Sequence, residues 1–185
     1  MTNKDNMSWV DDQEAKKEEE RSKEYFNVVE GKQEFILLSH CAPLAQVWVP
    51  SEKKYRVAED GDSNVSIKGL CWVLQDGIIK SARLPYTIVK DIRSYQQNDD
   101  WEFVLPFPHT FTLTAKNAGS KEVEYSLNAS PKKVEIPKEI LEELATKSTP
   151  EEIVEKIKEK TNENNKPVNN PTAEEEGINP EDIPF

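Results

Sequence analysis

The sequence predicts a mainly β domain with a polar segment on either side. Between residues 25 and 130, short apolar and alternating runs that are typical of strands follow one another, and a single helical pattern interrupts them. Charge has a matching distribution: residues 1–30 carry a net charge of −4 and residues 135–185 carry −8, whereas residues 31–134 carry +1. The middle of the chain is therefore the part suited to an apolar core.

The first half of the predicted domain contains three strand-like runs and one further extended piece. Residues 35–38 form a short apolar run, and residues 46–49 form a further extended piece between two prolines. Two longer strand-like runs, 67–74 and 78–84, flank Gln75-Asp76-Gly77, whose Asp-Gly pair is typical of a hairpin turn. We expect these last two runs to pair with each other.

A helix and two further strands follow. Pro85 suits the first position of a helix, and the apolar residues after it recur at helical spacing. These residues are Ile88, Val89, Ile92 and Tyr95. Residues 107–116 then alternate cleanly, with Phe107, His109, Phe111 and Leu113 on one face. A turn at residues 117–119 leads into a last alternating strand over residues 123–127.

This succession of three strands, a helix and two strands is that of the OB-fold, a five-stranded Greek-key barrel, here with a helix between strands 3 and 4. We assign the barrel to residues 25–130. A ferredoxin-like fold would need a helix after its first strand, and segment 50–64 is unsuited to a helix.

The flanking segments have three expected forms. Residues 1–24 are a frayed polar arm, in which two aspartates can cap a short helix that no apolar stripe anchors. Residues 131–160 contain two short helices, each opened by a proline, that pack on the barrel or on each other. Residues 161–185 are rich in Asn, Glu and Pro and are expected to form a disordered acidic tail.

The composition excludes several classes of protein. No apolar run approaches the roughly 20 residues of a membrane-spanning helix, and the polar start is no secretion signal. The two cysteines, Cys41 and Cys71, suit buried thiols of a cytosolic protein better than a disulfide framework. We therefore expect a cytoplasmic protein without a membrane partner.

The sequence ends in a compact acidic and apolar peptide, Glu181-Asp182-Ile183-Pro184-Phe185. Its apolar side chains, stiffening proline and terminal carboxylate suit a partner with an apolar pocket beside basic residues. An acidic solubilising tail is the plainer explanation, but such tails seldom end in Ile-Pro-Phe. The ending resembles the C-terminal tip of bacterial single-stranded DNA-binding proteins, although that tip is usually richer in aspartate. The resemblance implies docking to replication or repair proteins.

The body of the chain carries a second set of motifs. They are Tyr25-Phe26, Glu30-Gly31, Cys71-Trp72-Val73, Ile78-Ile79-Lys80, Leu84-Pro85, Asp99-Asp100-Trp101 and Phe111-Thr112-Leu113-Thr114. Together they are similar to an OB-fold family of single-stranded DNA-binding proteins that is common in bacteriophages, over roughly residues 25–160. This resemblance implies a phage or prophage origin, a location at the nucleoid or in the host cytoplasm, and a role in DNA replication, recombination or repair.

Binding of single-stranded DNA without sequence preference needs aromatic faces for the bases and cations for the phosphates. The candidate residues are Trp48, Lys53, Lys54, Tyr55, Arg56, Lys68, Trp72, Lys80 and Arg83. The favoured patch consists of Lys68, Trp72, Lys80 and Arg83, and residues 53–56 lie in a loop that can close over the strand. Phe111 and Tyr125 lie on the more apolar faces of their strands and are assigned to the core.

The net charge of −11 would normally argue against a nucleic-acid partner. The acid lies at the two ends of the chain, however, and the middle is nearly neutral. The acidic groups after Val134 can also compete with DNA for a basic groove, so that DNA binding would release the tip for partners.

Catalysis is not expected. His40 and His109 are the only histidines, and neither has the spacing of a metal site or a catalytic triad with the two cysteines. A nuclease built on Asp60, Asp62, Asp99 and Asp100 is conceivable, but these residues lie in turn-like segments where Asp is ordinary. We therefore expect no metal and no cofactor.

Two other binding functions stay open. An OB barrel without a DNA groove would act as an adaptor that only presents the tip, and a remoter option is oligosaccharide binding. The faces of the strands at the mouth of the barrel could also pair with another subunit and form a homo-oligomer.

Overall fold

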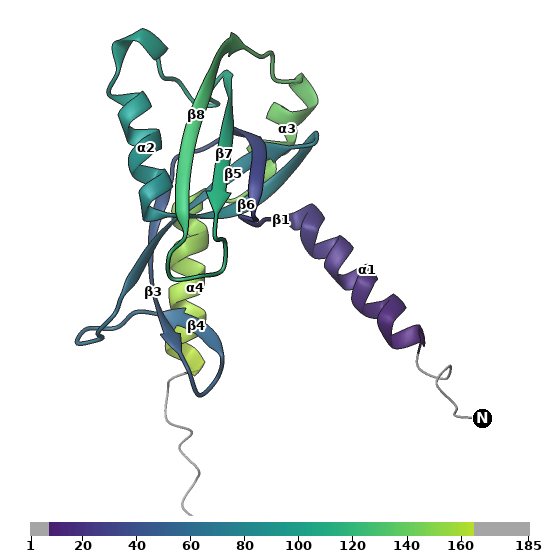
Figure 1. The fold of residues 1–185 in the computed structure, drawn as a ribbon, viewed down its shortest axis with the longest axis vertical. Helices are drawn as coiled ribbons and strands as arrows, with labels where there is room; N and C mark the ends of the chain where they lie inside the picture. Colours follow the sequence, from purple (N-terminus) through teal and green to yellow (C-terminus); the bar gives the residue numbers. More distant parts are fainter. Residues whose placement is uncertain (1–7, 165–185) are drawn as a thin grey trace, which may run out of the picture.

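The computed structural model describes residues 8–164 (Figure 1). Residues 165–185 lie outside the described part, and with them lie most of the expected disordered tail and the whole partner-binding tip. In chain order the elements are α1 (Ser8–Glu24), β1 (Tyr25–Phe26), β2 (Gly31–Leu37), β3 (Ala42–Val49), β4 (Lys54–Val57), β5 (Ser66–Gln75), β6 (Ile78–Pro85), α2 (Tyr86–Gln96), the 3-10 turn η1 (Asp99–Trp101), β7 (His109–Lys116), β8 (Glu124–Lys133), α3 (Lys138–Thr146) and α4 (Pro150–Asn164).

The strands form one open, mixed sheet. Along the main path their order is β1-β6-β5-β2-β7-β8, and β3 pairs with both β5 and β4 off this path. Among the strands of the described residues, only the β1–β6 pair is parallel. Within this path the strands β7-β2-β5-β6 follow the spatial order 4-1-2-3 of a Greek key. The prediction of a mainly β fold with several helices is confirmed.

The sheet is not closed into a five-stranded barrel within residues 8–164. The two ends of the path, β1 and β8, do not pair with each other. The free edge of β6 is instead taken by β1, where Tyr25 lies opposite Ser81 and Phe26 lies opposite Ala82. Because this short strand occupies the edge that β8 would need for closure, the gap between β6 and β8 stays open.

The core lies between the inner face of the sheet and α2. Alternation along β7 buries His109, Phe111, Leu113 and Ala115, in agreement with the face predicted from the sequence. Phe111 stacks on Phe107 with ring centroids 5.0 Å apart and lies 5.7 Å from Phe35 of the neighbouring strand. α2 closes this core with Ile88 and Ile92. The helical pattern after Pro85 is thus explained by packing of one apolar face.

The two C-terminal helices both pack on the sheet. Val154 of α4 lies in a buried cluster with Leu44 and Leu70, which are contributed by β3 and β5. The start of α4 is fixed by a capping box, in which the amide of Glu152 donates to the Thr149 hydroxyl at 3.3 Å and the amide of Thr149 donates to the Glu152 carboxylate at 2.9 Å. Ile140 and Leu144 of α3 pack in a second cluster with Leu74 and Trp72 of β5, so both helices cover part of the outer face of β5.

The polar arm forms a helix in its described part. α1 extends away from the sheet (Figure 1), and nearly all of its described side chains are exposed, including Trp9. An ion pair of 2.9 Å between Lys23 and Glu19 supports its last turn. As the sequence indicates, no apolar stripe anchors this helix along its length. No helix within residues 8–164 is long and apolar enough to cross a membrane.

Candidate nucleic-acid interface

A groove lies where the sheet is open, beside β6. It is a pocket of about 460 Å³ between β1, β5, β6 and the start of β8. Two tyrosines, Tyr25 and Tyr125, and two basic side chains, Lys68 and Arg83, line it together with smaller or apolar residues. We call this pocket the β6 groove.

The pairing register explains why these side chains meet. Lys68 lies opposite Pro85, and Arg83 lies opposite Leu70, so both basic residues are on the outer face of the β5–β6 hairpin. Tyr25 lies opposite Ser81 on the same face, because β1 continues the sheet beyond β6. The groove therefore follows from a hairpin register and from one added edge strand.

The groove has the electrostatic character that a polyanion requires. None of the described residues that line it is acidic, and two are basic. Burial lowers the pKa of Lys68 and raises the pKa of Tyr125, which indicates that both polar groups are partly removed from water. Charges in such a place are less screened by salt than charges on an open surface.

A second hollow of about 560 Å³ continues from the β6 groove. The two share Tyr25, Ser81 and Arg83, and the second extends to Trp72 and Lys147. Two acidic residues, Glu24 and Glu143, line this second hollow beside the basic Lys23, Arg83 and Lys147. Lys147 is paired with Glu143 and Lys23 with Glu19, so only Arg83 among these cations has no ion pair within the described residues. Since like charges repel phosphates, the β6 groove is the better site for a nucleic-acid backbone.

A separate aromatic pair lies on the hairpin of β3 and β4. Trp48 and Tyr55 are directly opposite in the register, are 46% and 52% exposed, and have ring centroids 5.0 Å apart in an edge-to-face arrangement. The sequence predicts a loop over residues 53–56, but residues 54–57 form the strand β4. This hairpin presents two rings that a base can reach, and Lys53 is exposed beside them.

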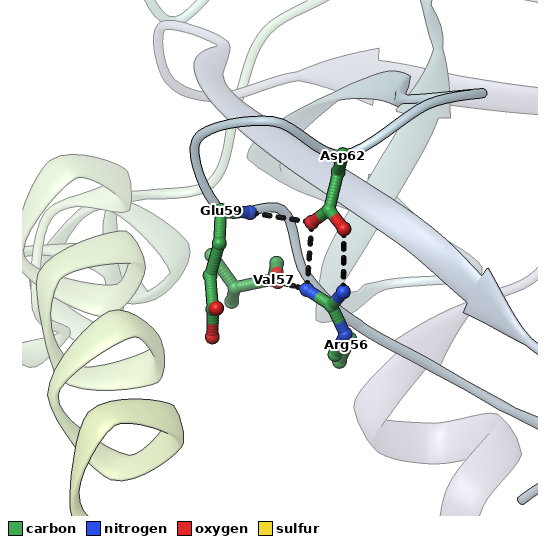
Figure 2. Close-up of polar contacts among 4 residues, drawn as sticks. All are labelled: Arg56, Val57, Glu59 and Asp62. Carbon is green, nitrogen blue, oxygen red and sulfur yellow. Dashed lines mark hydrogen bonds and ion pairs between the residues drawn. The ribbon is translucent and has the colours of Figure 1, made fainter. Parts of the chain in front are cut away.

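Two of the predicted cations on this hairpin are already paired. Lys54 forms an ion pair of 2.6 Å with Glu52. Arg56 donates two hydrogen bonds to the carboxylate of Asp62, at 2.7 and 2.6 Å, and a third to the carbonyl of Val57 (Figure 2). Arg56 would have to release Asp62 before it could clamp a phosphate in the same two-pronged way.

The Arg56–Asp62 pair fixes the loop that follows β4. The amide of Glu59 also donates to Asp62, at 2.7 Å, so one carboxylate receives bonds from a side chain and from the backbone (Figure 2). The Arg56 guanidinium, followed by this amide, lowers the pKa of Asp62, and the same pairing raises the pKa of Arg56. In the unbound protein we therefore assign Arg56 to the loop rather than to a ligand.

Trp72, the aromatic residue of the favoured patch, is covered. Its indole nitrogen donates to the carbonyl of Ser148 at 2.9 Å, and the amine of Lys147 lies 5.2 Å from its ring centre. Both partners belong to the link between α3 and α4, which lies over the ring. The link therefore covers part of the ring, which is half-buried, and holds it in a structural contact.

Lys80 also lies apart from the other members of the patch. It is opposite Val73, on the inner side of the hairpin, whereas Arg83 and Trp72 are on the outer side. Only 8% of Lys80 is exposed, and its amine donates to Gln75 at 2.9 Å. The favoured patch therefore reduces to Lys68 and Arg83, because the hairpin register separates Lys80 from them.

Two residues of the β6 groove were missed by the sequence analysis. Tyr125 alternates with the buried Leu127 and was assigned to the core, but it lies at the start of β8 and is only partly buried. Tyr25 belongs to a strand of two residues, which is too short to give a periodic signal. No sequence pattern pointed to either tyrosine as a ligand contact.

No three His, Cys, Asp or Glu side chains within residues 8–164 are grouped closely enough to hold a metal ion. The His109 ring bonds the carbonyl of Ser130 at 2.8 Å and packs edge to face against Trp101, so it belongs to the core.

No family model, curated protein or solved structure matches this chain.

Proposed function

We propose that this chain binds single-stranded DNA without marked sequence preference, protects it during replication, recombination or repair, and catalyses no reaction on it. The observation that carries the proposal is the β6 groove, where Tyr25 and Tyr125 meet Lys68 and Arg83 among described residues that include no acid. Stacking of a base on an aromatic ring contributes about 1–3 kcal/mol, so two tyrosines can hold a strand that two cations orient.

The topology supports an OB-type sheet that has stayed open. The Greek-key order of β7-β2-β5-β6 and the position of α2 between β6 and β7 both fit that fold. OB-folds bind oligonucleotides on the face of strands 2 and 3 and with the loops that follow strands 1 and 4. In this chain the face corresponds to the β5–β6 hairpin, which carries Lys68 and Arg83, and the loop after strand 1 corresponds to the β3–β4 region, which carries Trp48 and Tyr55.

The acidic C-terminal segment has a second part in the proposal. Its end, Glu181 to Phe185, lies outside the described residues, and we assign it to the recruitment of replication or repair proteins. Residues 165–185, which follow α4, carry a net charge of −4, so this acidic segment can also compete with DNA for the β6 groove. DNA binding would then free the tip for a partner.

A titration of fluorescently labelled oligo-dT tests both parts of the proposal. The full chain is compared with a version that ends at Asn164, each at low and at moderate salt. We expect affinity to fall steeply with salt, since each phosphate contact on a single strand contributes about −0.7 to the slope of log K against log salt. The absence of binding by both versions at low salt would refute DNA binding. Equal low-salt affinities of the two versions would refute competition by the tail but would leave DNA binding in place.

The alternative function is that of an adaptor, and one observation favours it. α3, α4 and their link cover part of the outer face of β5, including Trp72, which is the face that an OB-type DNA binder would use. An adaptor would have no DNA affinity to lose with salt. The same titration therefore separates the two functions.

A further inference from the structure

The two cysteines face each other across neighbouring strands. The pairing of β3 with β5 ends at Ala42 and Leu70, and the pairing of β2 with β5 ends at Leu37 and Val73. Cys41 precedes Ala42 and Cys71 follows Leu70, so the two cysteines lie side by side at the junction of these two ladders. Both side chains belong to the apolar cluster beneath α2, so they lie on the same face of the sheet. Neither is in a disulfide.

This placement is within the range of a disulfide bond. Residues that are directly opposite in an antiparallel pair have Cα atoms about 4.5–5.5 Å apart. Disulfides join Cα atoms that are about 4.4–6.8 Å apart. Gly69 leaves the space that the Cys41 side chain needs, because a Cβ atom at Gly69 would lie only 3.1 Å from the Cys41 Cβ.

The two thiols differ in their access to solvent. Cys71 is 0% exposed, whereas Cys41 is partly exposed and lines a surface pocket of about 180 Å³. A pocket of this size has room for a few water molecules, and therefore for a solute of similar size. His40 and Arg93 line the same pocket.

The acid–base properties of the pair differ in the same direction. The Cys71 thiol is placed to donate to the Cys41 sulfur, which lowers the pKa of Cys41 against the opposing effect of burial. The contact with Cys41, together with burial, raises the pKa of Cys71. The more reachable cysteine is thus also the one that more readily becomes a nucleophile.

We propose that Cys41 is an oxidation site for a small peroxide and that Cys71 is its resolving thiol. The Cys41 thiolate attacks one peroxide oxygen, the O–O bond breaks, and the leaving oxygen takes a proton to form water, which leaves a sulfenic acid on Cys41. The Cys71 sulfur then attacks the Cys41 sulfur, the S–O bond breaks, and hydroxide leaves as water with the Cys71 proton. Two thiols are oxidised to one disulfide while hydrogen peroxide is reduced to two waters.

The proposal is independent of DNA binding and has a structural consequence. The bond would close a loop that contains the whole β3–β4 hairpin, with Trp48 and Tyr55 at its far end. Cross-links restrict the unfolded chain, so the oxidised form should resist unfolding better than the reduced form if the bond forms without strain.

The test uses the full chain, freed of reductant and exposed to hydrogen peroxide. We expect the intact mass of the monomer to fall by two hydrogen atoms and both thiols to become unreactive to N-ethylmaleimide after unfolding in denaturant, with recovery on reduction. Oxidation should be slower by about tenfold or more in denaturant, where the pair is separated and Cys41 loses its environment. Retention of both thiols, or a product linked between two chains, would overturn the proposal.

Single variants separate the two roles. In Cys71→Ala the sulfenic acid on Cys41 cannot be resolved and should be trapped by dimedone, whereas in Cys41→Ala the buried Cys71 should stay reduced over the same time. Circular dichroism checks that each variant is folded, and the wild-type result stands if one is not. If dimedone labelled Cys71 in Cys41→Ala as fast as it labels Cys41 in Cys71→Ala, the assignment would be contradicted.

Discussion

The indole nitrogen of Trp72 donates a hydrogen bond to the carbonyl of Ser148, which lies 76 positions further along the chain, at a distance of 2.9 Å. This bond ties the middle of β5 to the link between α3 and α4. The bond also assigns a structural role to Trp72, which the sequence predicts as a DNA contact.

We predict that Trp72→Phe weakens the fold but not the binding of DNA. The change removes the bond to Ser148 and part of the ring that Lys147 covers, which should cost about 1–2 kcal/mol in the free energy of unfolding. Urea denaturation measures this loss, and a titration with oligo-dT should give an affinity within about twofold of wild type. A much larger loss of affinity in a stable variant would mean that α3 and α4 leave the ring when DNA binds.

Arg83→Gln should reduce DNA affinity and its dependence on salt. If Arg83 contacts a phosphate in the β6 groove, its loss should make the slope of log K against log salt shallower by about 0.7. Lys132→Gln is the matched control, because Lys132 is exposed on the same strand as Tyr125 but seven residues away, roughly 23 Å along β8. If the slope of log K against log salt were the same for the two variants, the β6 groove would not be the site of phosphate binding.

Trp48→Ala should weaken DNA binding and leave stability nearly unchanged. The ring is 46% exposed and contacts Tyr55 at the end of a hairpin, away from the core. Loss of one stacked base corresponds to about 1–3 kcal/mol, or about a 5- to 150-fold higher Kd. Tyr86→Ala removes an equally exposed ring from α2 and should leave Kd unchanged. The same oligo-dT titration measures both, and a thermal melt checks the fold.

Gly69→Ala tests the close packing of α2 on β5. A Cβ atom at this position would lie 2.5 Å from the Cγ2 of Val89, and valine in a helix has little freedom to turn away. We expect the free energy of unfolding to fall by about 1–3 kcal/mol. Val89→Ala made in the Gly69→Ala background should recover part of this loss, so the two changes are not additive in urea denaturation. Additive losses would show that the clash is absorbed elsewhere.

Much of the fold was predictable because its signals are local. Strict alternation identified β7, and the Asp-Gly turn identified the β5–β6 hairpin, in which Asp76 and Gly77 both adopt positive φ. The open edge was not predictable, since it depends on β1, a strand of two residues. The cover over Trp72 was not predictable either, because it depends on a contact between distant parts of the chain.

The candidate site was predicted in part. Lys68 and Arg83 do line one groove, and Trp48 and Tyr55 are exposed together. The error over Lys80 was avoidable: a two-residue turn fixes the register, which places Lys80 opposite Val73 and on the other face from Arg83. The pairing of Arg56 with Asp62 was not predictable, because the sequence does not indicate how the loop after β4 folds back.

Asp62 should link the order of this loop to pH. The pairing with Arg56, and then the amide of Glu59, lower the pKa of Asp62 in the folded chain. A carboxyl group with a lowered folded pKa stabilises the fold at pH values above its unfolded pKa of about 4, and this contribution disappears as pH falls through the lower folded value. Arg56 stays protonated throughout this window, because the pairing raises its pKa further.

We therefore expect Asp62→Asn to destabilise the protein at neutral pH and to make little difference once the pH is well below 4. Carbon-13 NMR of the Asp62 carboxyl group measures the titration directly, and Arg56→Gln should move its midpoint upward because the largest cause of the shift is gone. Asp60→Asn, a change at an exposed position in the same loop, is the control for unfolding measurements. An Asp62 midpoint that is the same with and without Arg56 would show that the backbone amide alone holds the carboxylate, and the loop would then owe its order to Glu59 rather than to the ion pair.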